Sequence, residues 1–281
     1  MILVTCPGGK TGRAAIAALA AAGRPVRALV RREAAAEAAL RDGAAETAAG
    51  DLADAAALMR AAKGCAAIYY IAPNMDPRER ALGDNVIAAA KGAGARLVFH
   101  SVLHPQLEAL PHHWQRHFVE QAIIESGVPF TILQPGSYMQ NMLPGWAATV
   151  ESGVHRMAYD VDAPMSLVDL DDIAAAAVRV LTDERFAHGI YELAGPAITL
   201  AEKAAVLTRV LGRDIRAEKQ EMDAFLKIAA GHGASDYAQL CMARMMPHYD
   251  AHGLVGSPAV LGWLLGRPPT DFETFARRVA G

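Results

Sequence analysis

Short apolar runs alternate with alanine-rich stretches through the first half of this 281-residue chain. The apolar runs are rich in β-branched and aromatic residues, as in strands covered on both faces, and lie at residues 2–5, 26–30, 66–71, 96–100 and 131–133. The stretches between them have helical spacing, at residues 13–22, 33–42, 53–62, 78–92 and 117–125. Such alternation predicts right-handed crossovers and an α/β fold built on a doubly wound parallel sheet.

The pattern changes after about residue 150. Segments near residues 153–157 and 165–168 precede a predicted helix over 171–181 and a strand near 190–193, and mostly helical sequence follows to the end. Thr199 and Glu202 have the spacing of a capping box, which predicts a helix beginning near Leu200. We therefore predict a first domain over residues 1–152, with 166–195 returning to its sheet, and a smaller, mostly helical part over 153–281.

Composition limits the partners of this chain. The net charge of −3 provides no basic stripe for nucleic acid, and no apolar run approaches the roughly 18 residues of a membrane helix. The amino-terminal sequence lacks the features of a signal peptide, and the three cysteines form no Cys-x-x-Cys pair. We expect a cytoplasmic protein with reduced thiols and a small-molecule partner. The oligomeric state is left open, with a homodimer as one expectation.

Residues 5–12, Thr-Cys-Pro-Gly-Gly-Lys-Thr-Gly, follow the first predicted strand and have the pattern of a dinucleotide-binding loop. In such loops one glycine lets the backbone approach a pyrophosphate, and the last lets helix and strand pack closely. Cys6 stands where the first glycine is usual and places a Cβ in a tight turn. The alternative is a purely structural turn. The residues predicted to bind a cofactor here are Gly8, Gly9, Lys10, Thr11 and Gly12.

The second predicted strand ends in Arg31 and Arg32, where an acidic residue would accept the ribose hydroxyls of NAD. Arginine at this place fits the 2′-phosphate of NADP, so the cofactor is predicted to be NADP(H). The alternative is a solvated strand end. Asp51, in Gly-Asp-Leu, either faces the adenine or caps a helix beginning at Ala53.

Several segments in order along the chain resemble the NmrA-like family of atypical short-chain dehydrogenases/reductases. They are residues 2–13, Val-Arg-Ala-Leu-Val-Arg (26–31), Gly-Asp-Leu (50–52), Ser-Gly-Val-Pro-Phe-Thr-Ile-Leu-Gln-Pro-Gly (126–136), Val-Asp-Leu-Asp-Asp-Ile-Ala (168–174), Tyr-Glu-Leu-Ala-Gly-Pro (191–196) and Gly-Arg-Pro-Pro-Thr-Asp-Phe (266–272). The resemblance covers almost the whole chain.

The resemblance implies a Rossmann-type NADP-binding domain followed by a smaller substrate-binding part. By this resemblance the loop glycines, Arg31 and Asp51 hold the adenosine and phosphates. Ala72 and Pro73 then line a ribose, Ser101 lies near the nicotinamide, and Asn141 matches an asparagine usual in the family. Members of the family are reductases of small aromatic or quinone-like molecules, or NADP-binding redox sensors.

Arg116 departs from the family pattern. Reductases of the family usually carry a lysine in this helix, which touches the nicotinamide ribose and assists proton transfer. Arginine can hold a ribose, but its pKa makes it a poor proton donor. Proton delivery to an unactivated ketone is worth roughly 10² to 10⁴ in rate. The expected substrate is therefore a small aromatic, quinone-like or conjugated acceptor, which needs less protonation.

Five histidines, at positions 100, 104, 112, 113 and 117, crowd the region around the predicted helix at 117–125. Histidine titrates near neutral pH and can replace a missing proton donor, although each of these residues can equally be structural. The predicted catalytic residues are His113, Tyr138 and Arg116. The predicted substrate-binding residues are His104, His112, Trp114, Tyr138 and Met139. His113 and His117 have metal-ligand spacing, but the sequence offers no third ligand, and no metal is expected.

These observations lead to one function and two alternatives. The first is an NADPH-dependent reductase that transfers hydride to a small activated acceptor. The second is a non-catalytic NADP(H) redox sensor. In the third, Cys6 blocks the cofactor loop and histidines perform acid/base chemistry without a cofactor.

Overall fold

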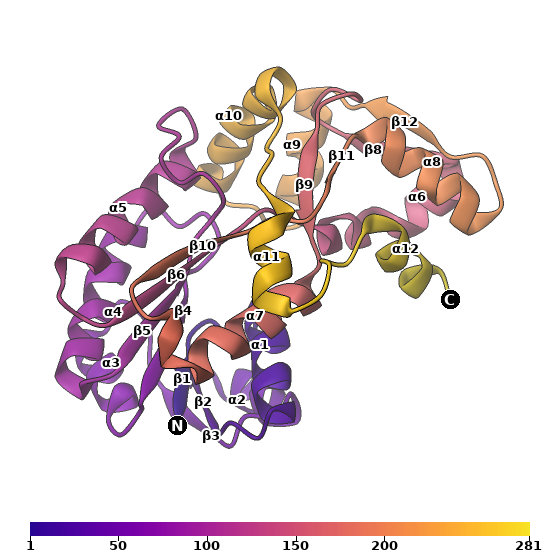
Figure 1. Ribbon diagram of the computed structural model, residues 1–281. Helices are drawn as coiled ribbons and strands as arrows, with labels where there is room; N and C mark the ends of the chain where they lie inside the picture. The colour runs from indigo at the N-terminus through magenta and orange to yellow at the C-terminus, as the bar shows by residue number, and fades with distance from the viewer. The chain divides into compact units, whose positions relative to one another are not determined.

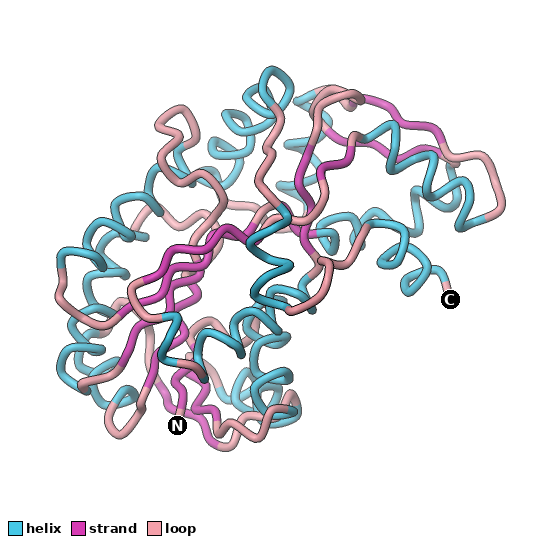
Figure 2. Tube along the Cα trace, viewed as in Figure 1, coloured by secondary structure: helices cyan, strands magenta, loops and turns pink.

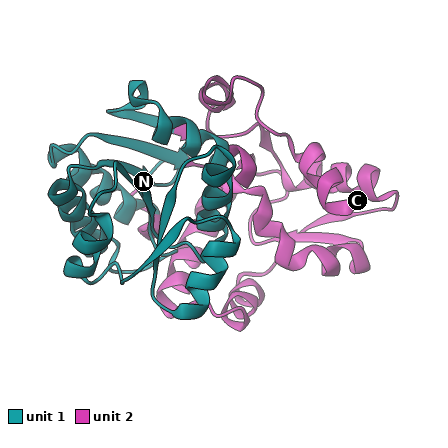
Figure 3. Cartoon of the chain, turned by 90° about the horizontal axis from the view of Figure 1, so that it is seen from below, with its two compact units in different colours: residues 1–106, 113–134, 173–191 teal, residues 107–112, 135–172, 192–281 magenta.

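The computed structural model describes residues 1–281, which form two compact units (Figure 3). Unit 1 comprises Met1–Gln106, His113–Gln134 and Ile173–Tyr191. Unit 2 comprises Leu107–His112, Pro135–Asp172 and Glu192–Gly281. The assignment of an NADP-binding and a substrate-binding domain stays a prediction.

A seven-stranded sheet forms the centre of unit 1, in the order β10-β6-β5-β4-β1-β2-β3 (Figure 1). The strands are β1 (Ile2–Val4), β2 (Val26–Val30), β3 (Glu46–Ala49), β4 (Ala67–Ile71), β5 (Arg96–His100), β6 (Phe130–Pro135) and β10 (Gly189–Leu193). All pairs from β3 to β6 are parallel. The predicted α/β fold class is confirmed. The sequence does not predict β3, because Glu-Thr-Ala-Ala has a weak preference for strands.

Helices cover both faces of this sheet (Figure 2). They are α1 (Lys10–Ala21), α2 (Glu33–Arg41), α3 (Ala55–Ala62), α4 (Glu79–Ala93), α5 (Pro111–Glu125) and α7 (Leu170–Thr182), followed by a 3₁₀ turn, η2 (Glu184–Phe186). Apolar side chains of α3, α4 and α5 form one continuous core with the sheet, to which Leu58, Val86 and Ile123 contribute.

Helix α5 begins at Pro111, six residues before the predicted start at residue 117. Proline is well suited to a first helical turn, because the N–H that it lacks has no partner inside the helix. The longer helix places His113 and Arg116 on the same element as the predicted segment. No helix of the structure combines the length and the apolar character that crossing a membrane requires.

Unit 2 contains two small sheets, ordered β11-β9-β7 and β12-β8. Its elements are β7 (Ser137–Tyr138), η1 (Met139–Gly145), α6 (Trp146–Ser152), β8 (Val154–Met157), β9 (Met165–Val168), β11 (Ala197–Ile198), α8 (Leu200–Leu211), β12 (Arg216–Lys219), α9 (Met222–Gly231), α10 (Asp236–His252), α11 (Pro258–Leu265) and α12 (Phe272–Ala280). The predicted capping box is confirmed: Thr199 accepts the Glu202 N–H at 3.1 Å, and Glu202 accepts the Thr199 N–H at 2.8 Å.

Two fully buried carboxylates tie distant segments of unit 2 together. Asp172 accepts hydrogen bonds from the Arg267 guanidinium (2.6 Å) and from the backbone N–H (2.6 Å) and hydroxyl (3.1 Å) of Thr270. Asp169 accepts from Gln140 at 2.7 Å and from Arg278 at 2.6 Å. The segments 168–174 and 266–272 therefore meet through the carboxylate of Asp172.

Candidate cofactor site

The order of the sheet marks one place in unit 1 as a binding crevice. The first strand, β1, lies between β4 and β2, so the chain proceeds in opposite directions on its two sides. In open α/β sheets, ligands bind at the carboxyl ends of the strands beside such a switch point. The loop from β1 to α1 begins there.

The start of α1 is suited to an anion. Its N-cap residue is Gly9, no side chain caps it, and its first turn has no acidic residue. Backbone N–H groups at a helix start point away from the helix and carry the positive end of its dipole. Phosphate groups bind to such helix starts.

The loop glycines match the needs of a diphosphate. A Cβ on Gly12 would lie 2.4 Å from the Cys6 carbonyl oxygen and 2.8 Å from the Pro7 Cα, so only glycine lets α1 pack this closely. A Cβ on Gly8 would meet nothing within 4 Å, and one on Gly9 would meet only the Cys6 carbonyl oxygen, at 3.5 Å. The space in front of Gly8 and Gly9 is therefore open, and the loop fits the phosphates of a dinucleotide.

Cys6 adopts the conformation that a glycine would have at this turn. Its φ is +48°, in the left-handed region that costs most residues about 1 kcal/mol. Its carbonyl oxygen accepts the Gly9 N–H at 3.2 Å, which closes the turn. Burial raises the pKa of the Cys6 thiol to about 11, so the side chain is neutral at neutral pH. The cysteine therefore keeps the turn and adds strain to it.

Replacing Cys6 with glycine is expected to raise the free energy of unfolding by about 1 kcal/mol, because glycine adopts positive φ without a steric cost. Chemical denaturation measures this change. Cys6→Ala is the matched control, since it removes the thiol but keeps the Cβ. An equal gain in both variants would show that the thiol, and not the backbone conformation, is the source of the strain.

The residues predicted to bind the cofactor lie in unit 1, and several of them follow neighbouring strands. Arg31 comes directly after β2, Asp51 shortly after β3, Ala72 after β4 and Ser101 after β5. Because the carboxyl ends of parallel strands share one edge of a sheet, these residues lie along the same edge as the β1–α1 loop.

Arg31 and Asp51 face each other at this edge. The Arg31 guanidinium lies 3.5 Å from the Asp51 carboxylate, and both side chains are exposed. Asp51 also accepts the Ala53 N–H at 2.8 Å, but it does not cap α3. That helix begins at Ala55 and its cap is Asp54, so the alternative in which Asp51 caps a helix at Ala53 is wrong. An exposed, weakly held guanidinium can turn toward a phosphate.

A second acid–base pair lies in the loop after β4 and was not predicted from the sequence. Arg78 makes a bidentate contact with Asp76, at 3.0 and 2.7 Å. These hydrogen bonds, opposed by partial burial and helped by the charge of Arg31, lower the pKa of Asp76. The sequence signal for this pair is the spacing Asp-Pro-Arg at 76–78.

Arg116 is buried and held by partners inside the protein. Its Nη1 donates to the His100 carbonyl oxygen at 2.6 Å, and its Nη2 lies 3.0 Å from the Glu79 carboxylate. The exposed fractions of the two side chains are only 6% and 1%. Burial raises the pKa of Glu79 to about 7, although Arg116 acts in the opposite direction. The guanidinium is thus part of a buried ion pair.

A second buried group surrounds Ser101. The Ser101 hydroxyl donates to the Glu120 carboxylate, and the Gln134 amide donates to both of its oxygens, at 3.0 and 2.9 Å. Burial raises the pKa of Glu120, against these hydrogen bonds and the charge of Arg116. The adjacent His100 bonds the Tyr69 hydroxyl at 2.7 Å, and burial and Arg116 lower its pKa to about 3. His100 is therefore neutral at physiological pH.

The predicted substrate and acid/base residues are divided between the units. His104, His113 and Trp114 belong to unit 1. His113 is fully buried, and its Nδ1 lies 3.3 Å from the carbonyl oxygen of His104, whose φ is +54°. Trp114 stacks on His117 with ring centroids 4.7 Å apart. The predicted residues in unit 2 are His112, Tyr138 and Met139.

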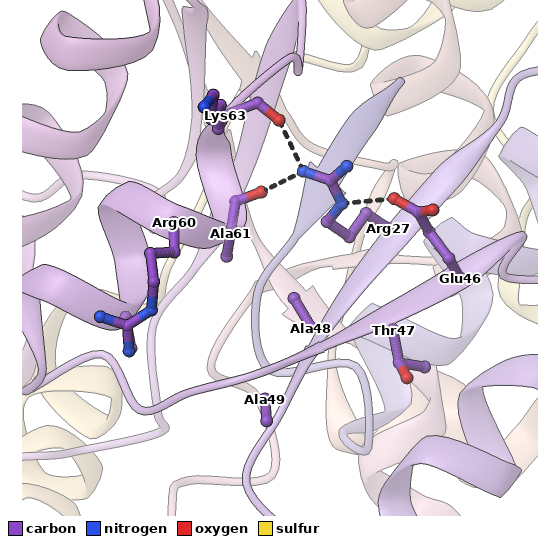
Figure 4. A pocket seen from close by; sticks show the side chains of 9 residues that line it. Arg27, Glu46, Thr47, Ala48, Ala49, Arg60, Ala61 and Lys63 are labelled. Carbon is purple, nitrogen blue, oxygen red and sulfur yellow. Dashed lines mark hydrogen bonds and ion pairs between the residues drawn. The ribbon is translucent and has the colours of Figure 1, made fainter.

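Each unit also has a pocket whose lining includes no residue of the β1–α1 loop. The pocket in unit 1, about 480 Å³, lies along β3 and α3, and in Figure 4 Arg27 contacts Glu46 and the carbonyl oxygens of Ala61 and Lys63. The pocket in unit 2, about 400 Å³, is lined by Met139, Leu167, Ile198 and Phe272 among others. No group of three His, Cys, Asp or Glu side chains is arranged to hold a metal ion.

Known proteins resemble this chain over most of its length. The model of the NmrA-like family matches residues 1–274. A (4-alkanoyl-5-oxo-2,5-dihydrofuran-3-yl)methyl phosphate reductase of Streptomyces griseus is 41% identical over 230 residues, 80% of this chain and 78% of that protein. An NAD(P)H azoreductase of Xenophilus azovorans is 31% identical over 284 residues, 99% and 97% of the two chains.

A solved structure agrees with these relatives. The NADPH-dependent quinone oxidoreductase of Escherichia coli, complexed with NADPH, has a TM-score of 0.87 and 28% sequence identity, with 100% of both chains covered. The match of the family model over nearly all residues, together with these similarities, establishes the assignment. The chain belongs to the NmrA-like family.

Proposed function

We propose that this protein is an NADPH-dependent reductase that transfers hydride to a small aromatic, quinone-like or conjugated acceptor. The observation that carries the proposal is the open loop between β1 and α1, which lies on the same sheet edge as Arg31. The names of its relatives support the reaction class, since they describe reductases that use NAD(P)H on azo compounds and quinones. The three cysteines are free thiols, which supports a cytoplasmic location.

The cofactor would be held by residues of unit 1 alone. The loop and the first turn of α1 would hold the diphosphate, Arg31 the 2′-phosphate and Asp51 the adenosine. Ala72 would line a ribose, and Ser101 would lie near the nicotinamide. When bound, NADPH supplies a hydride to the acceptor. The loop residues in this proposal are Gly8, Gly9, Lys10, Thr11 and Gly12.

The acceptor class follows from the state of Arg116. A guanidinium that is ion-paired with Glu79 and bonded to His100 does not donate a proton, so we assign to Arg116 a positioning role. We assign a positioning role to His113 as well, because it is buried against the backbone of His104. An acceptor that stabilises the incoming electron pair suits such a site.

The residues that we propose to contact the substrate belong to both units. In unit 1 we propose His104 and Trp114. In unit 2 we propose His112, Tyr138 and Met139, with the Tyr138 hydroxyl as the candidate proton donor. Met139 also lines the apolar pocket of unit 2.

Replacing Arg31 with alanine is expected to weaken NADPH binding by about 30- to 100-fold, because a charge-assisted contact to the 2′-phosphate is lost. NADH, which has no 2′-phosphate, should bind almost as before. Fluorescence titration with the two cofactors measures both effects. Arg41→Ala is the matched control, since Arg41 is an exposed arginine at the far end of α2. An equal loss for NADPH and NADH would reject this assignment.

NADPH oxidation by the purified protein tests the reaction itself. Quinones, azo dyes and conjugated enones should be reduced, whereas simple ketones should react far more slowly. The second candidate function is a non-catalytic NADP(H) sensor, which the internal pairing of Arg116 favours. Tight NADPH binding without oxidation by any activated acceptor would support the sensor and reject the reductase.

A further inference from the structure

One charge pair of unit 1 is incompletely satisfied. Arg116 uses its Nη1 and Nη2 for His100 and Glu79, but its buried Nε–H has no hydrogen-bond partner. The hydroxyl of Tyr70, which is also fully buried, has none either. Unsatisfied buried donors are rare and need an explanation, such as a ligand that the site is built to receive.

The surroundings of Glu79 connect this pair to the β1–α1 loop. Its carboxylate lies at the start of α4. The charges of Arg116 on α5 and of Asp76 in the loop before α4 both act on its pKa. The pKa of the Tyr70 hydroxyl is affected by the charges of Arg116, Glu79, Asp76 and Cys6. The positive charge of Arg116 also acts on Cys6, where it opposes the effect of burial on the thiol pKa, and on His100. The field of the guanidinium therefore reaches the loop.

We propose that Glu79 is a positioning residue that sets how much of the Arg116 charge acts on an anionic ligand at the β1–α1 loop. This inference rests on the proposed function, because the ligand is the cofactor. When Glu79 is ionised, the pair is neutral and Arg116 is held toward α4. When Glu79 is neutral, the positive charge of the guanidinium is uncompensated, and its attraction for a phosphate at the loop increases.

The burial of Glu79 places this change near neutral pH. Its pKa is raised to about 7 by burial, with Arg116 opposing the shift, while the pKa of Asp76 is lowered, so Asp76 stays ionised. Below that pH Glu79 is protonated and the anion meets an uncompensated guanidinium. Above it the carboxylate cancels that charge. Affinity for the anionic cofactor is therefore expected to fall as the pH rises through about 7.

A pH series of NADPH titrations tests this role. Between about pH 6 and pH 8, wild-type affinity should fall about fivefold more than that of Glu79→Gln, because Glu79 passes from mostly neutral to mostly ionised over this range. Because the 2′-phosphate also titrates near pH 6, the slope of Glu79→Gln gives the contribution of the ligand. Asp84→Asn, an exposed change on α4, should keep the wild-type slope.

The outcomes separate this inference from the proposed function. If wild type and Glu79→Gln bind NADPH with the same pH dependence, Glu79 does not have this role. If wild type binds no NADPH at any pH, the proposed function fails first and the inference falls with it. If Glu79→Gln does not fold, a pH series of NADH titrations of the wild-type protein tests the inference instead, because NADH lacks the titrating 2′-phosphate. Its affinity must fall about fivefold over the same range, and a constant affinity would overturn the inference.

Discussion

Replacing Gly12 with alanine is expected to weaken NADPH binding by about 100-fold and to lower the free energy of unfolding by about 3 kcal/mol. The new Cβ would lie 2.4 Å from the Cys6 carbonyl oxygen and 2.8 Å from the Pro7 Cα, and both are backbone atoms. Neither can move without opening the turn, so α1 must shift away from β1. The N–H groups at its start would then lose their alignment with a diphosphate.

The control for this substitution is Gly92→Ala. Gly92 lies inside α4, and a Cβ there meets nothing within 4 Å. Alanine is favoured over glycine in a helix, so this variant should gain about 0.5–1 kcal/mol and bind NADPH normally. Titration and chemical denaturation measure both variants. Normal binding by Gly12→Ala would show that the close packing of helix and loop is not required for the cofactor.

Replacing Asp172 with alanine is expected to lower the free energy of unfolding by about 3 kcal/mol. The carboxylate is fully buried and accepts three hydrogen bonds, so its loss leaves the Thr270 N–H and part of the Arg267 guanidinium without a partner. The half-exposed Arg267 can turn toward water, which limits the cost. Denaturant unfolding measures the change.

Asp171→Ala is the matched control for this variant. Asp171 is the adjacent residue, lies 3.1 Å from Arg278 and is 69% exposed, so its loss should cost no more than about 1 kcal/mol. Similar costs for the two substitutions would contradict a special role for the buried carboxylate in joining segments 168–174 and 266–272.

The fold of unit 1 is largely predictable because its strands are buried on both faces. Continuous apolar runs such as 66–71 and 96–100 identify central strands, and the glycine ends of helices mark the connections. The strand β3 lies at the edge of the sheet, where its alanine and threonine residues carry little signal. The two-residue strands of unit 2 are below the length at which periodicity can be recognised.

The candidate site was predictable in part. The loop glycines, Arg31, Asp51 and Ser101 follow strand ends, and the chain order alone brings strand ends to one edge. The pairing of Arg116 with Glu79 could not be predicted in this way. Glu79 lies 37 positions earlier, on another helix, and only tertiary packing brings the two side chains together. The burial of His113 could not be predicted either, because the sequence does not show the direction in which its ring points.

The most direct test of this account is a fluorescence titration of the wild-type protein with NADPH and NADH. NADPH is expected to bind saturably and at least about tenfold more tightly than NADH, because only NADPH offers a 2′-phosphate to Arg31. No binding of NADPH at millimolar concentration, or equal affinity for the two cofactors, would contradict it.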